Sequence, residues 1–386
     1  MYMESKFKAY PLRLLAPSFD STLTKLIIEL EHLRKQEIDG TTPAYLFYQL
    51  KRLFHLLESV GSARIEGNNT TVAEYLETKI EGRGELSRAD EATREIANIE
   101  HAMNYIEEYL GSGYPLNETF LKEIQQIIVQ DLGREGDLHA GAYRPSNVRI
   151  ANSPHCPPES NLVPAYMEEL FSFLRDDAPS QFDLIKVALA HHRLVWIHPF
   201  NNGNGRTVRL FTYALLLHYK FGVDVADRIV NPTAIFCSDR DRYYQMLSEA
   251  DSGEEDKLLA WCEYVLSGLK VEIEKVKRLC DYNYVQQRIL MPALDYALER
   301  EHITELEYKI LVLVVKKKEI QSADLQDLFE HKSAATRSAA IKKLVSQEML
   351  CPFEHNKRKY YIQFRNNFLL RGVMMALDKE GFLPIK

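Results

Sequence analysis

Apolar residues recur roughly every three or four positions through most of this 386-residue chain, and this periodicity is what most constrains its fold. The first such stripe, within residues 21–37, consists of Leu23, Leu26, Ile27, Leu30 and Leu33. Similar patterns predict further helices at 44–66, 90–110, 117–131, 162–175, 183–196, 206–221, 239–250 and 255–280. The sequence therefore predicts a mainly α-helical fold.

One stretch departs from the helical pattern. Residues 141–152, GAYRPSNVRIAN, combine turn-forming residues with Val148 and Ile150 in alternation. This composition predicts a short β-hairpin inserted among the helices.

Composition excludes several classes of protein. A net charge of -7 and 27% charged residues are ordinary for a globular protein and argue against a surface built throughout for nucleic acid or membrane. No apolar run approaches the length of about 18 residues that a membrane span needs, and the N-terminus does not resemble a signal peptide. The five cysteines are scattered and never form CxxC, so we expect a cytoplasmic protein without a disulfide framework or zinc site.

The C-terminal part has a different character. Residues 303–317, 321–330 and 332–349 predict three helices, and LCPFEHNKRKYYIQF, which follows, predicts two short strands around a polar turn. This is the element order of a winged helix-turn-helix. Residues 331–371 hold nine Lys or Arg against two Glu, which suits a nucleic-acid backbone. Such a module can instead serve as a docking or dimerisation surface, including one for a homodimer.

The loop HPFNNGNGR, residues 198–206, points to an anion site. Gly203-Asn204-Gly205 can direct successive N–H groups into an anion-binding nest at a helix N-terminus. Arg206 and Arg209 lie one turn apart in the following helix, where a cation is unfavourable by about 0.3–1 kcal/mol unless an anion binds. The alternative is a capped loop with surface arginines. The apolar residues around this helix instead predict buried arginines that need partners, and hence a di- or triphosphate site.

His198 begins the same loop and is the candidate general base, since an imidazole of pKa about 6.5 can take a proton from a hydroxyl at neutral pH. A histidine beside an apolar helix can also be purely structural. We interpret His191 and His192, on the preceding helix, as packing or capping groups.

At this point the residues resemble a known family. Residues 198–209 are similar to the signature HPFx(D/E)GNGRxxR of the Fic (filamentation induced by cAMP) family. The segment GAYRPSNVRI resembles the flap hairpin found upstream of that signature. Residues 62–67, SARIEG, match the inhibitory pattern (S/T)xxxE(G/N) in the N-terminal position of class II members. The resemblance covers roughly residues 40–270, and a winged-helix tail is common in class II relatives.

The resemblance implies a Fic-type helical core with a short β-hairpin flap, followed by a C-terminal winged-helix domain. The implied domains are an N-terminal helical region (1–110) with the inhibitory motif, a catalytic core (111–270) with the flap at 141–152, a linker helix (271–300) and a winged helix (301–386).

It also implies an activity: transfer of AMP from ATP to a hydroxyl side chain of a target protein. His198 would be the base, Gly203, Asn204, Gly205 and Arg206 would hold phosphates, and Arg209 would take the γ-phosphate. Val148 and Ile150 in the flap would clamp the protein target by strand addition. Tyr243 and Tyr244 either line the nucleotide or pack as ordinary helix residues.

Other functions stay open at this point. The chain could remove AMP from a modified protein or transfer another nucleotide or phosphate-linked group. It could also be a DNA-binding regulator whose Fic core senses a nucleotide.

Two positions bear on metal and regulation. The family usually has an acid that ligates Mg²⁺ where this chain has Asn202, whose carbonyl oxygen is expected to bind Mg²⁺ more weakly. Glu66 ends a predicted helix, where an anion favours a cationic partner. By resemblance that partner is Arg209, with support from Ser62, and the pair would compete with ATP. The alternative is an exposed Glu66 at a frayed helix end.

Overall fold

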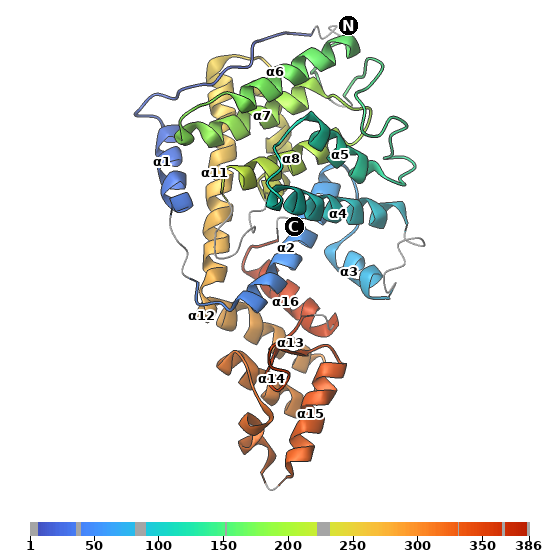
Figure 1. Cartoon of the computed structure of the whole chain (residues 1–386), viewed down its shortest axis with the longest axis vertical. Helices are drawn as coiled ribbons and strands as arrows, with labels where there is room; N and C mark the ends of the chain where they lie inside the picture. The colour runs from blue at the N-terminus through green and yellow to red at the C-terminus, as the bar shows by residue number, and fades with distance from the viewer. Residues whose placement is uncertain are drawn as a thin grey trace. The chain divides into compact units, whose positions relative to one another are not determined.

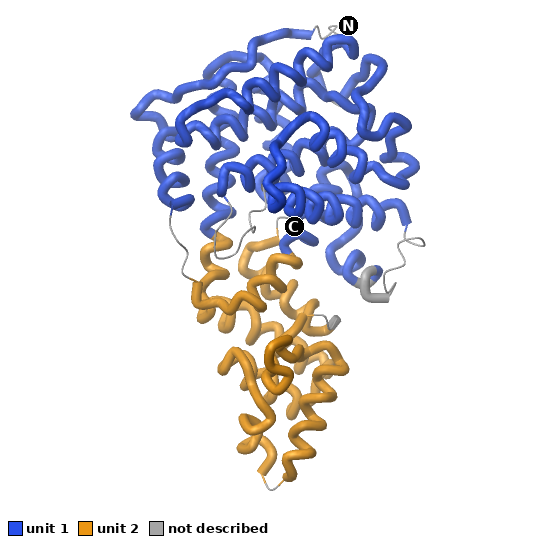
Figure 2. Tube along the Cα trace, viewed as in Figure 1, with its two compact units in different colours: residues 1–37, 54–274, 385 blue, residues 38–53, 275–384, 386 orange. Residues whose placement is uncertain are grey.

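The structure, a computed structural model, describes residues 7–35, 40–81, 90–150, 153–221, 232–330, 332–364 and 367–383. Its contacts divide the chain into two compact units, the first covering residues 1–37 and 54–274 and the second residues 38–53 and 275–384 (Figure 2). Within the described ranges, no helix has the length and apolar character that crossing a bilayer requires.

The helices account for most of the described chain. Up to residue 280 they are α1 (Thr22–Lys35), α2 (Ala44–Ile65), α3 (Val72–Glu81), α4 (Glu91–Gly111), α5 (Glu118–Val129), α6 (Val163–Arg175), α7 (Asp183–Ile197), α8 (Asn204–His218), α9 (Pro232–Cys237), α10 (Arg240–Ala250) and α11 (Glu255–Cys280). The predicted mainly helical fold is confirmed, and all nine predicted helices in this part are present within a few residues of their expected ends. The short helices α3 and α9 were not predicted, because each has too few turns to show a clear stripe.

Helices α7 and α8 form the centre of the first unit. They pack against each other, with α4 and α5 also against α8 and α6 against α7 (Figure 1). Almost every residue of α7 is buried, and so are the α8 residues from Asn204 to Leu216 except the half-buried Gly205. The loop that joins these two helices, residues 198–203, is therefore anchored at both ends in the core.

The predicted hairpin at 141–152 needs correction. Residues 141–150 form turns, bends and irregular chain without a strand ladder, and 151–152 lie outside the described residues. The segment is bound to the loop instead: the Arg144 N–H donates to the Pro199 carbonyl at 2.9 Å, and Pro145 has no N–H to offer a ladder. A lone two-stranded hairpin is marginal in water, so these other contacts determine the conformation.

The second unit contains α12 (Tyr282–Tyr284), a π-helical turn (Val285–Leu290), α13 (Met291–Glu299), α14 (Glu305–Lys317), α15 (Ala334–Ser346) and α16 (Asn367–Lys379). Strands β1 (Leu350–Pro352) and β2 (Tyr360–Ile362) pair antiparallel, with Leu350 opposite Ile362. In the described part of the chain this is the one sheet.

The predicted element order of the tail is largely present. Helices α14 and α15 and the β1–β2 hairpin lie where the sequence places them. The helix predicted at 321–330 is instead two 3-10 turns, Ser322–Leu325 and Asp327–Phe329, because a segment this short gains little from helical propagation. Ile320 forms a single bridge to Tyr360, beside the hairpin. The winged-helix assignment stays a prediction.

Candidate active site

The loop between α7 and α8 is held in one tight conformation. Helix α7 ends at Ile197, and the next residue, His198, adopts a left-handed backbone with φ of 50°. Gly203, with φ of 78°, precedes α8, and a Cβ there would lie 2.9 Å from Val129 Cγ1. The Asn204 side chain closes the loop by accepting from the Phe200 N–H (2.9 Å) and donating to the Phe200 carbonyl (2.8 Å). The Asn204 side chain thus fixes the loop. Because this side chain is used in the loop, the Asn204 backbone N–H is the group that can face a phosphate.

His198 is half-buried at the start of this loop. Burial lowers the pKa of its imidazole to about 4, and the positive charge of Arg144 adds to the effect, while Glu66 opposes it. Arg144 is itself anchored, because its Nε donates to the His198 carbonyl at 2.8 Å and its Nη2 to the Pro158 carbonyl at 2.5 Å. At neutral pH the ring is uncharged and one of its nitrogens can accept a proton.

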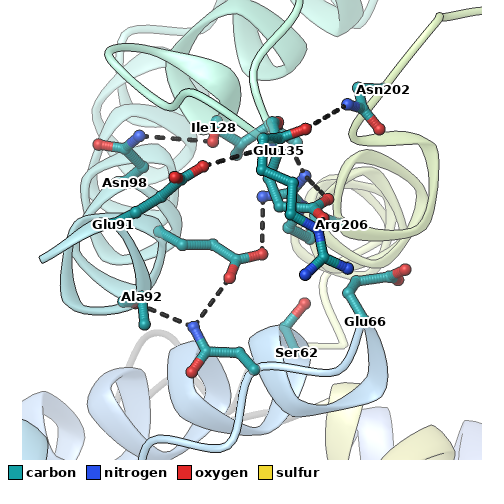
Figure 3. A network of polar contacts seen from close by, with 12 residues as sticks. Ser62, Glu66, Glu91, Ala92, Asn98, Ile128, Glu135, Asn202 and Arg206 are labelled. Atoms are coloured by element: carbon teal, nitrogen blue, oxygen red, sulfur yellow. Dashed lines mark hydrogen bonds and ion pairs between the residues drawn. The ribbon is translucent and has the colours of Figure 1, made fainter.

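Arg206 pairs with two carboxylates, the buried Glu95 and the half-buried Glu135. Its Nη1 donates to Glu95 Oε1 at 2.7 Å, and its Nη2 lies 3.4 Å from Glu135 Oε2 (Figure 3). The side chain is 1% exposed, and among the described residues its Nε has no hydrogen-bond partner. A buried donor without an acceptor is costly, so this edge of the guanidinium is suited to receive an oxygen from a ligand.

Arg209 is bound by helix α2. Its Nε donates to Ser62 Oγ at 2.9 Å, and its Nη2 donates to the Ser62 carbonyl at 2.9 Å and to Glu66 Oε1 at 2.7 Å. Burial acts to raise the pKa of Glu66, but Arg209 and Arg206 outweigh it and hold the pKa below its usual range. Glu66 is therefore an anion paired with Arg209, as the resemblance predicts, although it lies in the turn just after α2 and is itself exposed.

The Glu66 carboxylate also covers the start of α8. A Cβ built on Gly205 would lie 2.0 Å from Glu66 Oε1 and 3.1 Å from Arg209 Nη1. The carboxylate thus lies against the first turn of α8, where the N–H groups and the helix dipole favour a negative charge. A protein carboxylate lies where the sequence predicts a phosphate.

Asn202 offers little to a metal ion. Its Nδ2 donates to the Gly136 carbonyl at 2.9 Å and to the Arg134 carbonyl at 3.3 Å (Figure 3). One neutral amide oxygen is left, whereas Mg²⁺ is usually held by at least one carboxylate. Across the described ranges, no group of three His, Cys, Asp or Glu side chains is arranged to hold a metal. The Asn202 side chain is therefore not suited to be a ligand that holds Mg²⁺ tightly.

Of the tyrosines and histidines that the sequence analysis considered near the site, some lie in the core and one lies at the surface. The Tyr243 hydroxyl lies 2.9 Å from His191 Nε2, and both side chains are buried, while His192 bonds Tyr10 and Asp251. Tyr244 is 41% exposed, and its hydroxyl approaches the Ile65 carbonyl at 3.5 Å, beside Glu66. Tyr244 is thus available to a ligand, whereas Tyr243 packs in the core.

In the segment predicted as a flap, Val148 and Ile150 are both half-buried. No pairing occupies the backbone of residues 147–150 as a strand within the described part of the chain. The segment lies near the loop because Arg144 is anchored to His198 and Pro199.

Several residues that shape the site were missed from the sequence. Glu95 and Glu135 hold Arg206, Arg144 holds the His198 backbone, and Gln125 and Asp137 contact the loop from outside it. Glu95 is on α4 and Gln125 is on α5, so only tertiary packing brings them here. The one available signal was an acid at position 95 inside a helix stripe, among apolar residues.

Comparisons with known proteins agree on this region. A sequence profile of the Fic/DOC family matches residues 115–216, which include α5, α7 and most of α8. Relatives named protein adenylyltransferase Fic are 30% identical over 207 residues in Nematostella vectensis and 31% identical over 204 residues in Aedes aegypti. These matches cover 50% and 52% of this chain but only 42% and 37% of the relatives, so the chain spans less than half of either protein's length.

Solved structures show the same fold. A Fic family protein from Desulfovibrio desulfuricans G20 superposes with a TM-score of 0.55 at 19% identity, over 92% of this chain and 98% of that protein. Fic-1 from C. elegans superposes with a TM-score of 0.52 at 18% identity, over 66% of this chain and 73% of its own.

Proposed function

Because residues 115–216 form a domain of the Fic/DOC family, we propose that this chain is a protein adenylyltransferase that transfers AMP from ATP to a hydroxyl side chain of another protein. One observation carries the proposal: an uncharged histidine and two buried arginines surround the N-terminus of one central helix. The names of the relatives from Nematostella vectensis and Aedes aegypti support it.

His198 is the general base in this reaction. The target hydroxyl oxygen bonds to the α-phosphorus of ATP while the bond to the β-phosphate oxygen breaks, and pyrophosphate leaves. The hydroxyl proton passes to the imidazole, which the lowered pKa keeps uncharged and able to accept it at neutral pH. The hydrogen bond from Arg144 to the His198 carbonyl holds the His198 backbone in place during the transfer.

The phosphates lie at the start of α8. Backbone N–H groups of residues 203–205 and the helix dipole face them, as at other helix N-termini that bind phosphate. The buried Nε of Arg206 supplies a donor that no described residue uses. Charge that builds up on the leaving pyrophosphate is stabilised by these fixed donors.

Glu66 is the inhibitory residue. Its contact with Arg209 at 2.7 Å and its position over Gly205 support this role, because a carboxylate there would compete with the γ-phosphate. ATP must displace it to bind productively, so the resting enzyme is inhibited by its own helix α2. Ser62 strengthens this state through two hydrogen bonds to Arg209.

The protein substrate binds along the segment 147–150. Among the described residues this segment forms no strand ladder, so it can pair with an extended target segment by strand addition, with Val148 and Ile150 against the target side chains. This would place the target hydroxyl near His198, since Arg144 joins the two segments.

Labelled ATP tests the function. Incubation of the Glu66→Gly protein with a cell lysate and ATP labelled at the α-phosphate is expected to label protein, whereas ATP labelled at the γ-phosphate is not. Label from the γ-phosphate would indicate a kinase. No label from either would contradict nucleotide transfer and favour a nucleotide-sensing regulator.

A further inference from the structure

Asn202 departs from the family signature, and its contacts explain the departure. Both carbonyls that its Nδ2 reaches, Gly136 at 2.9 Å and Arg134 at 3.3 Å, are acceptors. An amide can donate to them, whereas a carboxylate would place its own negative oxygens against them. We propose that Asn202 is a positioning residue that joins the pre-flap loop, residues 131–142, to the loop 198–203, and that it does not serve as a ligand for Mg²⁺.

A second set of hydrogen bonds joins the same two loops. Asp137 accepts from the Asn202 backbone N–H at 3.4 Å through Oδ2 and from Asn201 Nδ2 at 3.2 Å through Oδ1. Its Oδ1 also accepts from the His139 N–H at 2.9 Å. Both carboxylate oxygens of Asp137 are therefore already engaged by N–H groups, and an acid at position 202 would add a second negative charge beside it.

Gln125 completes the connection from helix α5. It is fully buried, and its Nε2 donates to Asp137 Oδ2 at 3.1 Å and to the Asn202 carbonyl at 3.2 Å. Its Oε1 accepts from the Gly141 N–H at 2.6 Å, at the end of the pre-flap loop. The side-chain amides of Gln125 and Asn202 thus hold the pre-flap loop at several points.

The connection reaches the proposed phosphate site through Glu135. This residue lies between Arg134 and Gly136, the two acceptors of Asn202, and its carbonyl is 3.3 Å from Arg206 Nη2 (Figure 3). The Asn202 hydrogen bonds therefore fix the backbone that contacts Arg206. In this chain position 202 acts on the nucleotide by positioning Arg206 and not through a metal ion.

Thermal unfolding of the full-length protein tests the positioning role without any activity measurement. Asn202→Asp is expected to lower Tm by at least about 4 °C, because two hydrogen bonds are lost and a carboxylate faces two carbonyls. The matched control is Asn147→Asp, since Asn147 uses its side-chain oxygen to accept from the Ser160 N–H at 2.8 Å and a carboxylate can do the same. The control is expected to keep the parental Tm.

A binding measurement tests the metal part, which rests on the proposed nucleotide site. In the Glu66→Gly background, the affinity for ATP is measured with Mg²⁺ and with EDTA by calorimetry. Asn202→Ala is expected to weaken both affinities, about 3- to 10-fold, and to leave their ratio unchanged.

The outcomes separate this inference from the proposed function. An Asn202→Asp protein with parental Tm, or one that gains affinity for ATP only when Mg²⁺ is present, would overturn the positioning role and restore the metal ligand. A ratio that changes in Asn202→Ala would do the same. Failure of the Glu66→Gly protein to label any target, with these shifts intact, would overturn the transferase proposal alone.

Discussion

Replacing Glu66 with glycine frees Arg209, and the size of the gain follows from the contact that is lost. The Arg209 side chain is 1% exposed and Glu66 28%, and their charged atoms are 2.7 Å apart. Coulomb's law at an effective dielectric constant of about 20 gives roughly 6 kcal/mol for this pair, of which desolvation of the carboxylate offsets a large part. A net competition of about 3 kcal/mol corresponds to a roughly 100-fold rise in kcat/KM for ATP.

Ser62 provides the internal comparison. Ser62→Ala removes the hydroxyl that accepts from Arg209 Nε at 2.9 Å but leaves the Ser62 carbonyl, which accepts from Nη2, in place. One hydrogen bond from a charged donor is worth about 1.5 kcal/mol, so the expected gain is about tenfold or less. Initial rates of target labelling at several ATP concentrations measure both values. A gain in Ser62→Ala as large as in Glu66→Gly, or no gain in either, would refute competition at Arg209.

Three further predictions concern the base, the loop and the tail. His198→Ala should abolish transfer and leave the affinity for ATP, measured by calorimetry, unchanged. In the unmutated chain, the transfer rate should fall as the pH drops through about 4, because the His198 imidazole becomes protonated there. A midpoint near pH 6.5 would contradict the burial of this imidazole. Gly205→Ala should lower the free energy of unfolding of the nucleotide-free protein by about 2 kcal/mol, because the new Cβ displaces Glu66. In the Glu66→Gly background the same substitution should lower it by less than about 0.5 kcal/mol. Equal decreases in both backgrounds, measured by urea unfolding, would disprove the contact between Glu66 and Gly205. If the tail binds DNA, log affinity should fall with log salt at a slope of about -4.5, given five exposed basic residues: Lys332, Lys342, Lys343, Lys357 and Arg358. An absence of gel shift at low salt would leave the docking function.

Local sequence patterns were sufficient for most of the helices and for the loop. The stripe of α8 predicted a central helix and therefore buried arginines, and Arg206 and Arg209 are indeed buried. The Gly203 backbone is left-handed, as a nest of alternating residues requires. These features depend on residues close together in the chain.

What the sequence could not supply is the partners that come from distant helices. Glu95 reaches Arg206 across 111 positions, and no periodicity identifies such a pair. The hairpin at 141–152 was predicted from turn-forming residues and a short alternation, but Arg144 instead binds the carbonyls of the loop 198–203. Asn202 looked like a weakened metal ligand because its amide nitrogen and the carbonyls of the pre-flap loop meet only in the folded chain.

The central claim is that the protein transfers AMP with His198 as the general base once the Glu66 carboxylate is removed. Intact-mass spectrometry of the Glu66→Gly protein after incubation with ATP measures this directly, alongside a Glu66→Gly/His198→Ala double variant. We expect the single variant to gain the mass of one or more AMP groups on itself or on an added protein target, and the double variant to gain none. An unmodified single variant and target, or equal modification in both variants, would contradict the account.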